Sequence, residues 1–420
     1  MLKIDIQSEI GSLDAVLLHR PGAEVENMTP RNVQRALYSD ILNLSIAQKE
    51  YEQLSGVLSG LCKVYEVAEL LVKVLDNVDS RERLIRRICV EEDAMPYMEM
   101  LLDMSSTDLA RVLIEGLPAR IDTLTSYLNN EYYALYPLYN FYFTRDAAVT
   151  IGNGALVCRM ANKVRMREAL IMDAIYRYSG EFDCQVTDAN ALHPSSPVTM
   201  EGGDIIVARE DILIVGNGMR TTAQGIDFMV DGFRNRCREG KYHILVQQLP
   251  HEPESFIHLD MAFTLLDYDK CMIFKPLIAG ANQYQTVHIT INDGKVTRIR
   301  PVSGLLPALK KLGMDLKAII CGGEDEWDQE REQWHSGANS FAFAPGKIIS
   351  YARNIHTVEE LHRNGFEILK ASDVIAGKHS GTVMDPAVPC AVLIDGSELP
   401  RGGGGARCMT MPLSRRPVQW

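Results

Sequence analysis

A cysteine follows a run of four glycines late in the sequence, where only Ala406 and Arg407 separate Cys408 from residues 402–405. Ordering four glycines costs much backbone entropy and adds almost nothing to a core, so another interaction must compensate. Two interpretations are open from these residues alone. The run is either a flexible tail, or a loop whose bare backbone lets a ligand approach and presents Cys408 as a nucleophile.

Two further segments place acidic side chains beside apolar sequence. The aromatic run 140–146 reads as a strand that ends in Asp146, and Glu201 and Asp204 enclose two glycines immediately before the apolar run 205–207. The structural interpretation is a strand-end ion pair in the first segment and a glycine turn with solvated acids in the second. The functional interpretation is that the glycines hold both carboxylates close to a neighbouring group.

A histidine and an aspartate, His258 and Asp260, precede the apolar run 262–266. In a strand, residues i and i+2 point to the same face, so we expect these two side chains to lie next to each other. Cys408, His258 and Glu201 together supply a nucleophile, an acid/base and an orienting carboxylate, which is an arrangement of nucleophilic catalysis.

The remaining carboxylates, Asp146 and Asp260, indicate the charge of the substrate. Negative groups around a thiol raise its pKa and suppress the nucleophile, so such surroundings do not suit a conventional cysteine protease. Paired carboxylates do suit a cationic substrate. A guanidinium group offers five N–H donors in a fixed fork, and the carboxylates accept them. We therefore hypothesise that the bound cation offsets the repulsion and activates Cys408.

The composition is that of an ordinary globular chain with a large core. The 420 residues are 46% apolar and 23% charged, and the formal net charge is −12. An acidic chain without long Lys/Arg runs is not expected to bind nucleic acid or an anionic membrane surface.

The nine cysteines never form Cys-x-x-Cys, so neither a disulfide framework nor a clustered zinc site is expected. Early acidic residues and the lack of a long apolar run predict a reduced, cytoplasmic protein without a signal peptide or membrane span.

Five short β-rich runs, each followed by an amphipathic segment, must position these groups. They begin at Asp14, Gly154, Asp211, Lys270 and Lys347. Their irregular spacing favours α/β units around a common centre over one doubly wound sheet. None is followed by a Gly-rich nucleotide fingerprint in the strand-to-helix context that such a motif requires.

The region 76–127 breaks this pattern. Its apolar residues recur at helical spacing, Ser105 begins a Ser-Ser-Thr-Asp helix start, and strand signals are absent. We predict a helical insertion with a structural role. Shortly after it, the sequence Ile-Gly-Asn-Gly at 151–154 predicts the turn of a β-hairpin.

Seven segments resemble, in order, motifs of the microbial arginine deiminases. They are NFYFTRD (140–146), RMANKVR (159–165), EGGD (201–204), GNGMRTT (216–222), HLD (258–260), EREQWHSGAN (330–339) and ARCMTMP (406–412). The N-terminal segments 9–22 and 47–50 look similar too, so the match runs nearly end to end. One such motif is a weak signal, whereas the ordered set is specific.

The resemblance implies one catalytic domain over residues 1–420, folded as a five-bladed pseudo-symmetric α/β propeller with the helical insertion at 76–127. It implies hydrolysis of free L-arginine to L-citrulline and ammonia through a covalent S-alkylthiouronium intermediate on Cys408. Neither a cofactor nor a metal is implied. The expected partner is the small-molecule substrate L-arginine, and the expected assembly is a homo-oligomer.

The resemblance also assigns the reacting groups. Cys408 matches the nucleophile that attacks the guanidinium carbon. His258 matches the acid/base that protonates departing ammonia and later accepts a proton from water. Glu201 matches the carboxylate that partners the histidine, and Asp146 and Asp260 match the pair that grips the guanidinium nitrogens.

Four other positions match supporting residues. Asn140, Arg165 and Arg220 match groups that bind the amino-acid end of the substrate, and Asp204 is expected to support the acid/base region from behind. Bidentate arginine contacts read an α-carboxylate, which agmatine lacks, so free arginine is favoured. In isolation, either arginine would be interpreted as part of a surface salt bridge.

Three positions depart from the family pattern. Ala147 stands where proline is common, Ser39 where an acidic residue is commoner, and Gly403 where some relatives carry a long side chain thought to gate the pocket. The departure at Gly403 argues against gating of the pocket by this loop, although not against movement of the loop. The glycines still allow a narrow, movable loop to cover the substrate and present the thiol.

Other functions stay open as alternatives. Within the same fold these are a dimethylarginine hydrolase, an agmatine deiminase or an amidinotransferase, and Arg165 and Arg220 argue against agmatine. A non-catalytic arginine-binding protein is disfavoured because all five reacting positions are filled. A zinc hydrolase is disfavoured because the ten histidines show neither His-Glu-x-x-His nor a clustered ligand spacing.

Overall fold

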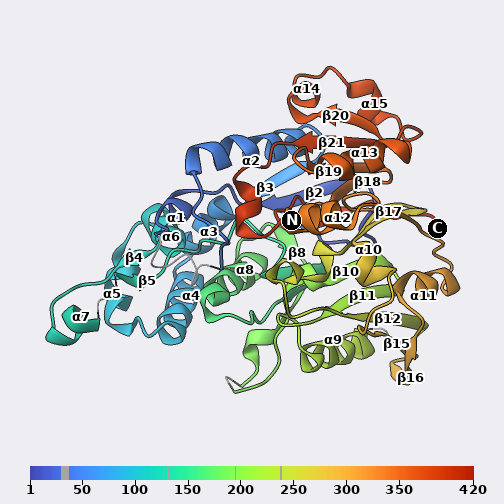
Figure 1. The fold of residues 1–420 in the computed structure, drawn as a ribbon. Helices are drawn as coiled ribbons and strands as arrows, with labels where there is room; N and C mark the ends of the chain where they lie inside the picture. Colours follow the sequence, from blue (N-terminus) through green and yellow to red (C-terminus); the bar gives the residue numbers. More distant parts are fainter. Residues whose placement is uncertain (30–36, 130–131, 194, 237–238) are drawn as a thin grey trace.

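The structure is a computed structural model that describes residues 1–29, 37–129, 132–193, 195–236 and 239–420. All five predicted β-rich runs form strands, and helices follow them (Figure 1). The strands are β2 (Leu13–Leu18), β7 (Gly154–Val157), β11 (Ile212–Asn217), β14 (Lys270–Ile273) and β19 (Lys347–Tyr351). The helices that follow them are α1 (Ala23–Glu26) and α2 (Leu44–Ser59), α8 (Met166–Tyr178), α9 (Ala223–Arg236), α10 (Lys275–Ile278) and α13 (Ile355–Arg363).

The five strands, here called the central strands, occupy the same place in five sheets. Each pairs antiparallel with one neighbour, here called the outer strand, and parallel with the other. The outer strands are β22 (Met411–Arg415), β6 (Ala148–Ile151), β10 (Ile205–Arg209), β13 (Phe263–Asp267) and β18 (Phe341–Ala344). The parallel neighbours are β3 (Lys63–Glu66), β9 (Gln185–Asp188), β12 (Lys241–Gln248), β17 (Lys317–Ile320) and β21 (Cys390–Ile394). The chain therefore builds the same three-stranded unit five times.

Other strands extend two of these sheets or form small separate ones, and all sheets in the described part of the chain are open. The added strands are β15 (Thr286–Asn292) and β16 (Lys295–Val302) beside β12, β20 (Glu367–Lys370) beside β21, and the pairs β1 (Leu2–Lys3) with β8 (Phe182–Asp183) and β4 (Leu117–Pro118) with β5 (Tyr133–Leu135). The remaining helices are α3 (Val67–Asp76), α4 (Val78–Glu91), α5 (Met98–Asp103), α6 (Ser106–Glu115), α7 (Leu124–Asn129), α11 (Leu305–Lys311), α12 (Glu326–Trp334), α14 (Ala371–Ile375) and α15 (Ser380–Met384).

Helices α4, α5 and α6 lie within the region 76–127. The Ser105 hydroxyl accepts the backbone N–H of Asp108 at 3.1 Å, so the predicted helix start is confirmed. Helical packing begins before this region with α3, and β4 inside it pairs with β5, although the sequence there carries no strand signal. These elements extend to one side of the sheets (Figure 1, left).

The predicted strand over residues 140–146 is wrong. This segment forms consecutive turns, in which Phe143 N donates to Asn140 O and Asp146 N donates to Phe143 O, and β6 begins only after it. The aromatic side chains of the segment are buried in two hydrophobic cores. Tertiary packing, rather than strand pairing, therefore accounts for its apolar character. The hairpin turn predicted at 151–154 is confirmed, because Ile151 and Gly154 are paired where β6 meets β7.

The predicted strand geometry at residues 258–260 is also wrong. Met261 N donates to His258 O and Ala262 N donates to Leu259 O, which makes a 3₁₀ turn, η6 (Leu259–Met261), just before β13. His258 and Asp260 therefore do not share the face of a strand. Each projects from the turn toward a different set of partners, as the site geometry shows.

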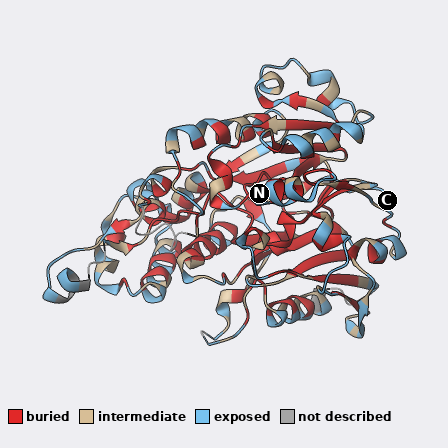
Figure 2. Ribbon diagram, viewed as in Figure 1, coloured by how far each residue is buried: buried red, intermediate tan, exposed pale blue. Residues whose placement is uncertain are grey.

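The interior of the molecule consists mainly of the sheets, and the helices expose their outer faces (Figure 2). Strand β22 pairs with β2, with Leu13 opposite Arg415, so the two ends of the described chain share one sheet. This pairing fixes the turn that precedes β22. No helix in the described ranges has the length and apolar character needed to cross a membrane.

Candidate active site

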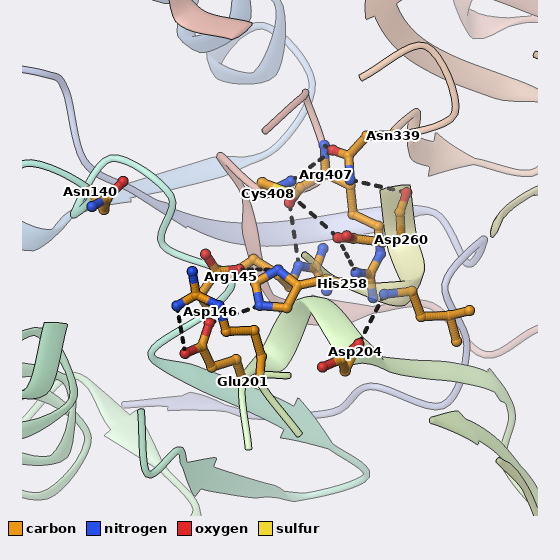
Figure 3. Close-up of polar contacts among 12 residues, drawn as sticks. Asn140, Arg145, Asp146, Glu201, Asp204, His258, Asp260, Asn339, Arg407 and Cys408 are labelled. Atoms are coloured by element: carbon orange, nitrogen blue, oxygen red, sulfur yellow. Dashed lines mark hydrogen bonds and ion pairs between the residues drawn. The ribbon is translucent and has the colours of Figure 1, made fainter. Parts of the chain in front are cut away.

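The predicted site residues stand directly before the outer strands of different units. Asp146 lies before β6, Asp204 before β10, Asp260 before β13 and Cys408 before β22, and the same place before β18 holds Asn339. The five outer strands pair with equivalent central strands, so their starting ends carry these groups to one region. Their side chains converge there (Figure 3).

The Cys408 thiol is buried beside a carboxylate, and its Sγ lies 3.6 Å from Asp260 Oδ2. The Cys408 backbone is held on both sides, because its N–H donates to Asn339 Oδ1 at 3.1 Å and its carbonyl accepts from Arg145 N at 3.1 Å. Burial, followed by the charges of Asp260 and Asp146, raises the pKa of the thiol well above its usual range. The thiol of the free protein is therefore protonated at neutral pH.

His258 is held as a cation by the carboxylates around it. Its Nε2 lies 2.8 Å from Glu201 Oε2 and its Nδ1 lies 3.7 Å from Asp146 Oδ1. Burial alone would lower the pKa of the imidazole, but the charge of Asp146 and the hydrogen bond to Glu201 outweigh it and raise the pKa to about 9. Burial would likewise raise the pKa of Glu201, but the charge of Arg220 and the bond from His258 hold it well below its usual range. At neutral pH the pair is a protonated acid beside a carboxylate, which is the form that can donate a proton.

Asp146 and Asp260 share one pattern of partners. Arg165 Nη1 donates to Asp146 Oδ2 at 2.7 Å, and Arg407 Nη1 donates to Asp260 Oδ2 at 2.7 Å. The second oxygen of each carboxylate, Asp146 Oδ1 and Asp260 Oδ1, is buried and accepts no hydrogen bond. Leaving a buried carboxylate oxygen without a donor costs free energy. Two such oxygens near the thiol are suited to the N–H groups of a cation.

The glycine run forms an ordered loop over the thiol, so the flexible-tail interpretation is wrong. A Cβ on Gly404 would lie 2.6 Å from the Phe143 ring and 2.9 Å from Cys408 Cβ. Gly403 has a φ of +81°, in the left-handed region that favours glycine. Close packing and backbone conformation thus explain why residues 402–405 are small.

The space between this loop and the thiol is almost filled. The cavity beside Cys408 has a volume of about 10 Å³, which holds about one water molecule and no guanidinium group. This arrangement, here called the closed form, would have to open before it could admit a group of that size. Of the predicted site residues, the cavity is lined by Asn140, Asp146, Arg165, His258 and Cys408.

Arg165 has different surroundings from those expected of a residue that reads a substrate carboxylate. It is buried between two protein carboxylates, with Nη1 donating to Asp146 and with Nε and Nη2 donating to Glu168 at 3.1 Å and 2.8 Å. In this closed form its donors are therefore engaged within the protein. Arg220 is held less tightly than Arg165, because its ion pair with Glu201 is longer, with Nη1 at 3.4 Å from Oε1.

Asp204 and Asn140 stand at the margins of the cluster. Asp204 Oδ1 accepts the backbone N–H of Leu259 at 2.9 Å, which orients the turn that carries His258 and Asp260. Burial raises the pKa of Asp204 to about 7. Asn140 borders the cavity, and its backbone carbonyl accepts from Arg165 Nη2 at 3.4 Å. In Figure 3 its side chain lies to one side of the labelled charged groups.

Sequence reasoning missed Asn339, Arg407, Glu168 and Glu9 as parts of the site. Arg407 bridges Asp260 and Glu9, with its Nε 3.1 Å from Glu9 Oε2. Burial would raise the pKa of Glu9, but the charge of Arg407 outweighs it and lowers the pKa to about 2. Asn339 could have been found from the sequence. Four of the five units place a polar group before the outer strand, so a polar residue was to be expected at the same place in the fifth unit. Glu168 carried none, since an acid one helical turn after an arginine is common on exposed helices.

One group in the described ranges has the geometry of a metal site. Single ligand atoms from Asp146, Glu201 and His258 lie within 4.8 Å of one another, and carboxylate and imidazole are donors that transition metals accept. Arg165 and Arg220 already form ion pairs with the two carboxylates. The protein's own cations thus occupy part of the coordination space that a metal would need.

Comparison with known families and proteins identifies relatives over the whole chain. The family model described as arginine deiminase matches residues 34–415. An arginine deiminase of Bacillus cereus is 32% identical over 433 residues, which cover 99% of this chain and 99% of the relative. An arginine deiminase of Listeria monocytogenes is 31% identical over 431 residues, which cover 99% of this chain and 98% of the relative.

Solved structures share the fold at lower identity. An amidinotransferase from Microseira wollei in the saxitoxin biosynthetic pathway matches with a TM-score of 0.53 at 12% identity, covering 99% of this chain and 98% of that chain. The N-terminal domain of a cyanobacterial arginine dihydrolase matches with a TM-score of 0.52 at 14% identity, covering 96% and 97%. These likenesses confirm the predicted α/β class. By its family model and its full-length relatives, the chain belongs to the arginine deiminase family.

Proposed function

We propose that the protein hydrolyses free L-arginine to L-citrulline and ammonia through a covalent S-alkylthiouronium intermediate on Cys408. The observation that carries this proposal is the pair of buried oxygens, Asp146 Oδ1 and Asp260 Oδ1, that lack a donor near the thiol. Two N–H groups of one guanidinium would satisfy both oxygens and bring its carbon to the sulfur. Membership of the arginine deiminase family supports the same substrate.

The first half of the reaction exchanges ammonia for sulfur. The Cys408 thiolate attacks the guanidinium carbon and forms a C–S bond in a neutral tetrahedral adduct. Protonated His258 gives its proton to one nitrogen, the C–N bond breaks, and ammonia leaves. The positive charge of the resulting S-alkylthiouronium stays beside Asp146 and Asp260.

The second half restores the thiolate. Neutral His258 accepts a proton from a water molecule while the water oxygen bonds to the same carbon. The C–S bond then breaks and the thiolate of Cys408 leaves. The hydroxyl proton of the adduct passes to ammonia in solution, so the products are citrulline and ammonium. Glu201 holds the imidazole in place through their 2.8 Å contact.

Substrate binding activates the thiol in this scheme. Burial and two neighbouring carboxylates raise the pKa of Cys408 in the free protein. A bound guanidinium supplies the opposite charge, so the thiol releases its proton to solvent water before the attack. We expect little thiolate absorbance at neutral pH without ligand and an increase when an unreactive guanidinium compound binds, with Cys408→Ala as the blank. A thiol that titrates well below neutral without ligand would contradict this account.

We assign recognition of the amino-acid end to Asn140, Arg165 and Arg220. Arg165 is bound by Asp146 and Glu168 in the closed form, so reading an α-carboxylate requires it to rearrange as substrate enters. Arg165→Ala should lose activity toward arginine. Turnover of agmatine retained in that variant would favour an agmatine deiminase instead.

We further propose that the five three-stranded units form a five-bladed propeller, that residues 1–420 act as one catalytic domain, and that 76–127 are a helical insertion within it. In support, one outer strand from each unit begins beside a site residue. We also propose a cytoplasmic location and a homo-oligomeric assembly. Size-exclusion chromatography with light scattering tests the assembly, and a single monomeric species would contradict it.

The decisive experiment incubates the purified protein with free arginine and measures citrulline and ammonia. Wild type should form both in equal amounts and Cys408→Ala neither. The matched control is Cys390→Ala, which removes a buried thiol in β21 and should keep the activity. Equal citrulline formation by wild type and Cys408→Ala would overturn the mechanism.

Parallel assays separate this function from its rivals. Dimethylarginine and agmatine replace arginine in the same assay, and a preference for either would reassign the substrate. Binding of arginine without citrulline formation would indicate a non-catalytic binding protein. Activity should survive a strong chelator, and its loss would point to a metal at the group formed by Asp146, Glu201 and His258.

A further inference from the structure

The side chain of Asn339 joins two parts of the site. Its Oδ1 accepts the backbone N–H groups of Arg407 at 3.0 Å and Cys408 at 3.1 Å, and its Nδ2 donates to the backbone carbonyl of Asp260 at 3.2 Å. All four residues are buried, and Figure 3 shows the amide beside both segments. One side chain therefore links the turn that carries the nucleophile to the turn that carries the carboxylate.

Neighbouring contacts make this link tight. A Cβ on Gly405 would lie 2.9 Å from both Cβ and Oδ1 of Asn339, so only a glycine lets the chain pass this close to the amide. The Arg407 side chain binds Asp260 Oδ2 at 2.7 Å, and Cys408 Sγ lies 3.6 Å from the same oxygen. Asn339 and Arg407 thus together set the separation between the sulfur and the carboxylate.

We infer that Asn339 is a positioning residue, which holds the sulfur of Cys408 at bonding distance from a guanidinium gripped by Asp260. This inference rests on the proposed function. The amide of Asn339 bonds to backbone groups on both sides and does not line the cavity beside Cys408, so it acts on the rate of attack and not on recognition of the amino-acid end. A displacement of about 1 Å at the reacting atoms lowers a rate about 10²-fold.

The bonding pattern is specific to asparagine. The site needs one acceptor for two N–H groups and one donor for a carbonyl, and an amide supplies both. Alanine leaves the Cys408 N–H buried without an acceptor, and it leaves the Arg407 N–H with only a long 3.5 Å bond to the backbone carbonyl of residue 339. Aspartate accepts both N–H groups but cannot donate to Asp260, and it adds a negative charge near the thiol. The two substitutions therefore separate loss of the anchor from a change of charge.

The first test compares kcat and KM for citrulline formation from arginine. Asn339→Ala should lower kcat about 10²-fold and keep KM within about threefold. Asn339→Asp should lower kcat and also move the acid limb of its pH profile upward, because the added charge raises the thiol pKa. The matched control, Asn354→Ala, removes another buried asparagine, whose Nδ2 donates to His335 O; it should keep both constants within about twofold.

The second test follows alkylation of Cys408 by iodoacetamide without arginine, detected by mass spectrometry. Asn339→Ala should react at least about tenfold faster than wild type, because the released turn opens locally. Asn339→Asp keeps both N–H bonds and should react about as slowly as wild type. If the alanine variant does not fold, the aspartate variant carries the test through its pH profile and its alkylation rate.

Three results would overturn the inference: an unchanged kcat in Asn339→Ala, an increase in KM with kcat retained, or a thiol in that variant as unreactive as in wild type. A wild-type protein that forms no citrulline would instead overturn the proposed function. The alkylation rates would then still decide whether Asn339 anchors Cys408.

Discussion

Replacing Glu201 with glutamine should lower the pKa of His258. The imidazole pKa of about 9 lies above the ordinary value of 6.5, a difference worth about 3 kcal/mol in favour of the imidazolium. Glutamine keeps the shape of Glu201 and removes its charge, and one opposite charge within about 4–6 Å changes a pKa by about 1–3. Asp146 remains 3.7 Å from the ring. We therefore expect the variant's His258 to titrate at about 6–8.

The same substitution changes how stability depends on pH. Folding raises the pKa of His258, so its protonation contributes fully to stability below about pH 6.5, and the contribution disappears as pH rises through about 9. Wild type should lose about 3 kcal/mol of unfolding free energy from this group across that window. Glu201→Gln should lose at most about 2 kcal/mol, because the pKa of its histidine rises less on folding.

NMR titration of ring-labelled histidine measures the pKa directly, with the resonance assigned by His258→Gln. Urea unfolding at about pH 6 and about pH 10 measures the stability difference. The control is Glu332→Gln, which removes a buried carboxylate that binds Thr357 instead of His258. A His258 pKa in Glu201→Gln within about 0.5 of the wild-type value would refute the reasoning.

Further substitutions test the supports of the site. Arg407→Met leaves Glu9 and Asp260 buried without their shared cation and should cost about 3–5 kcal/mol in urea unfolding; a cost below about 1 kcal/mol would show that the ion pairs contribute little. Gly404→Ala inserts a methyl group into filled space and should cost about 1–3 kcal/mol and most of the citrulline formation. Gly403→Ala meets no atom within 4 Å and should cost only the roughly 1 kcal/mol of its left-handed backbone; equal losses in the two glycine variants would contradict the packing argument.

The strands of this fold were predictable where short β-rich runs lie between turn signals. All five predicted runs are central strands, and β7 and β19 are buried along their whole length. The same reasoning failed at 140–146 and 258–260, where apolar residues are buried by tertiary contacts in turns. Apolar patterning reports burial, and only hydrogen-bond partners distant in sequence decide whether a buried segment is a strand.

The proposed reacting groups could be named from the sequence because their chemistry is tied to residue type. A cysteine, a histidine and surplus carboxylates indicate a nucleophile, an acid/base and a cationic substrate, and these side chains do converge. The role of Asn339 was not predictable from its type, because its amide bonds to backbone groups that every residue carries. The pairing of Arg165 with Glu168 was hidden for a related reason, since only the fold decides that this helix end is buried.

The pairing of β22 with β2 affects when, during synthesis of the chain, the site can first be complete. Translation proceeds from the N-terminal end, so β2 and the carboxylate-bearing turns leave the ribosome well before the segment with Cys408. During translation, the segments that carry His258 and the carboxylates can fold before Cys408 has been synthesised. If Cys408 is the nucleophile as proposed, the last outer strand must pair with the first central strand before arginine can react, so the nascent chain would be inactive.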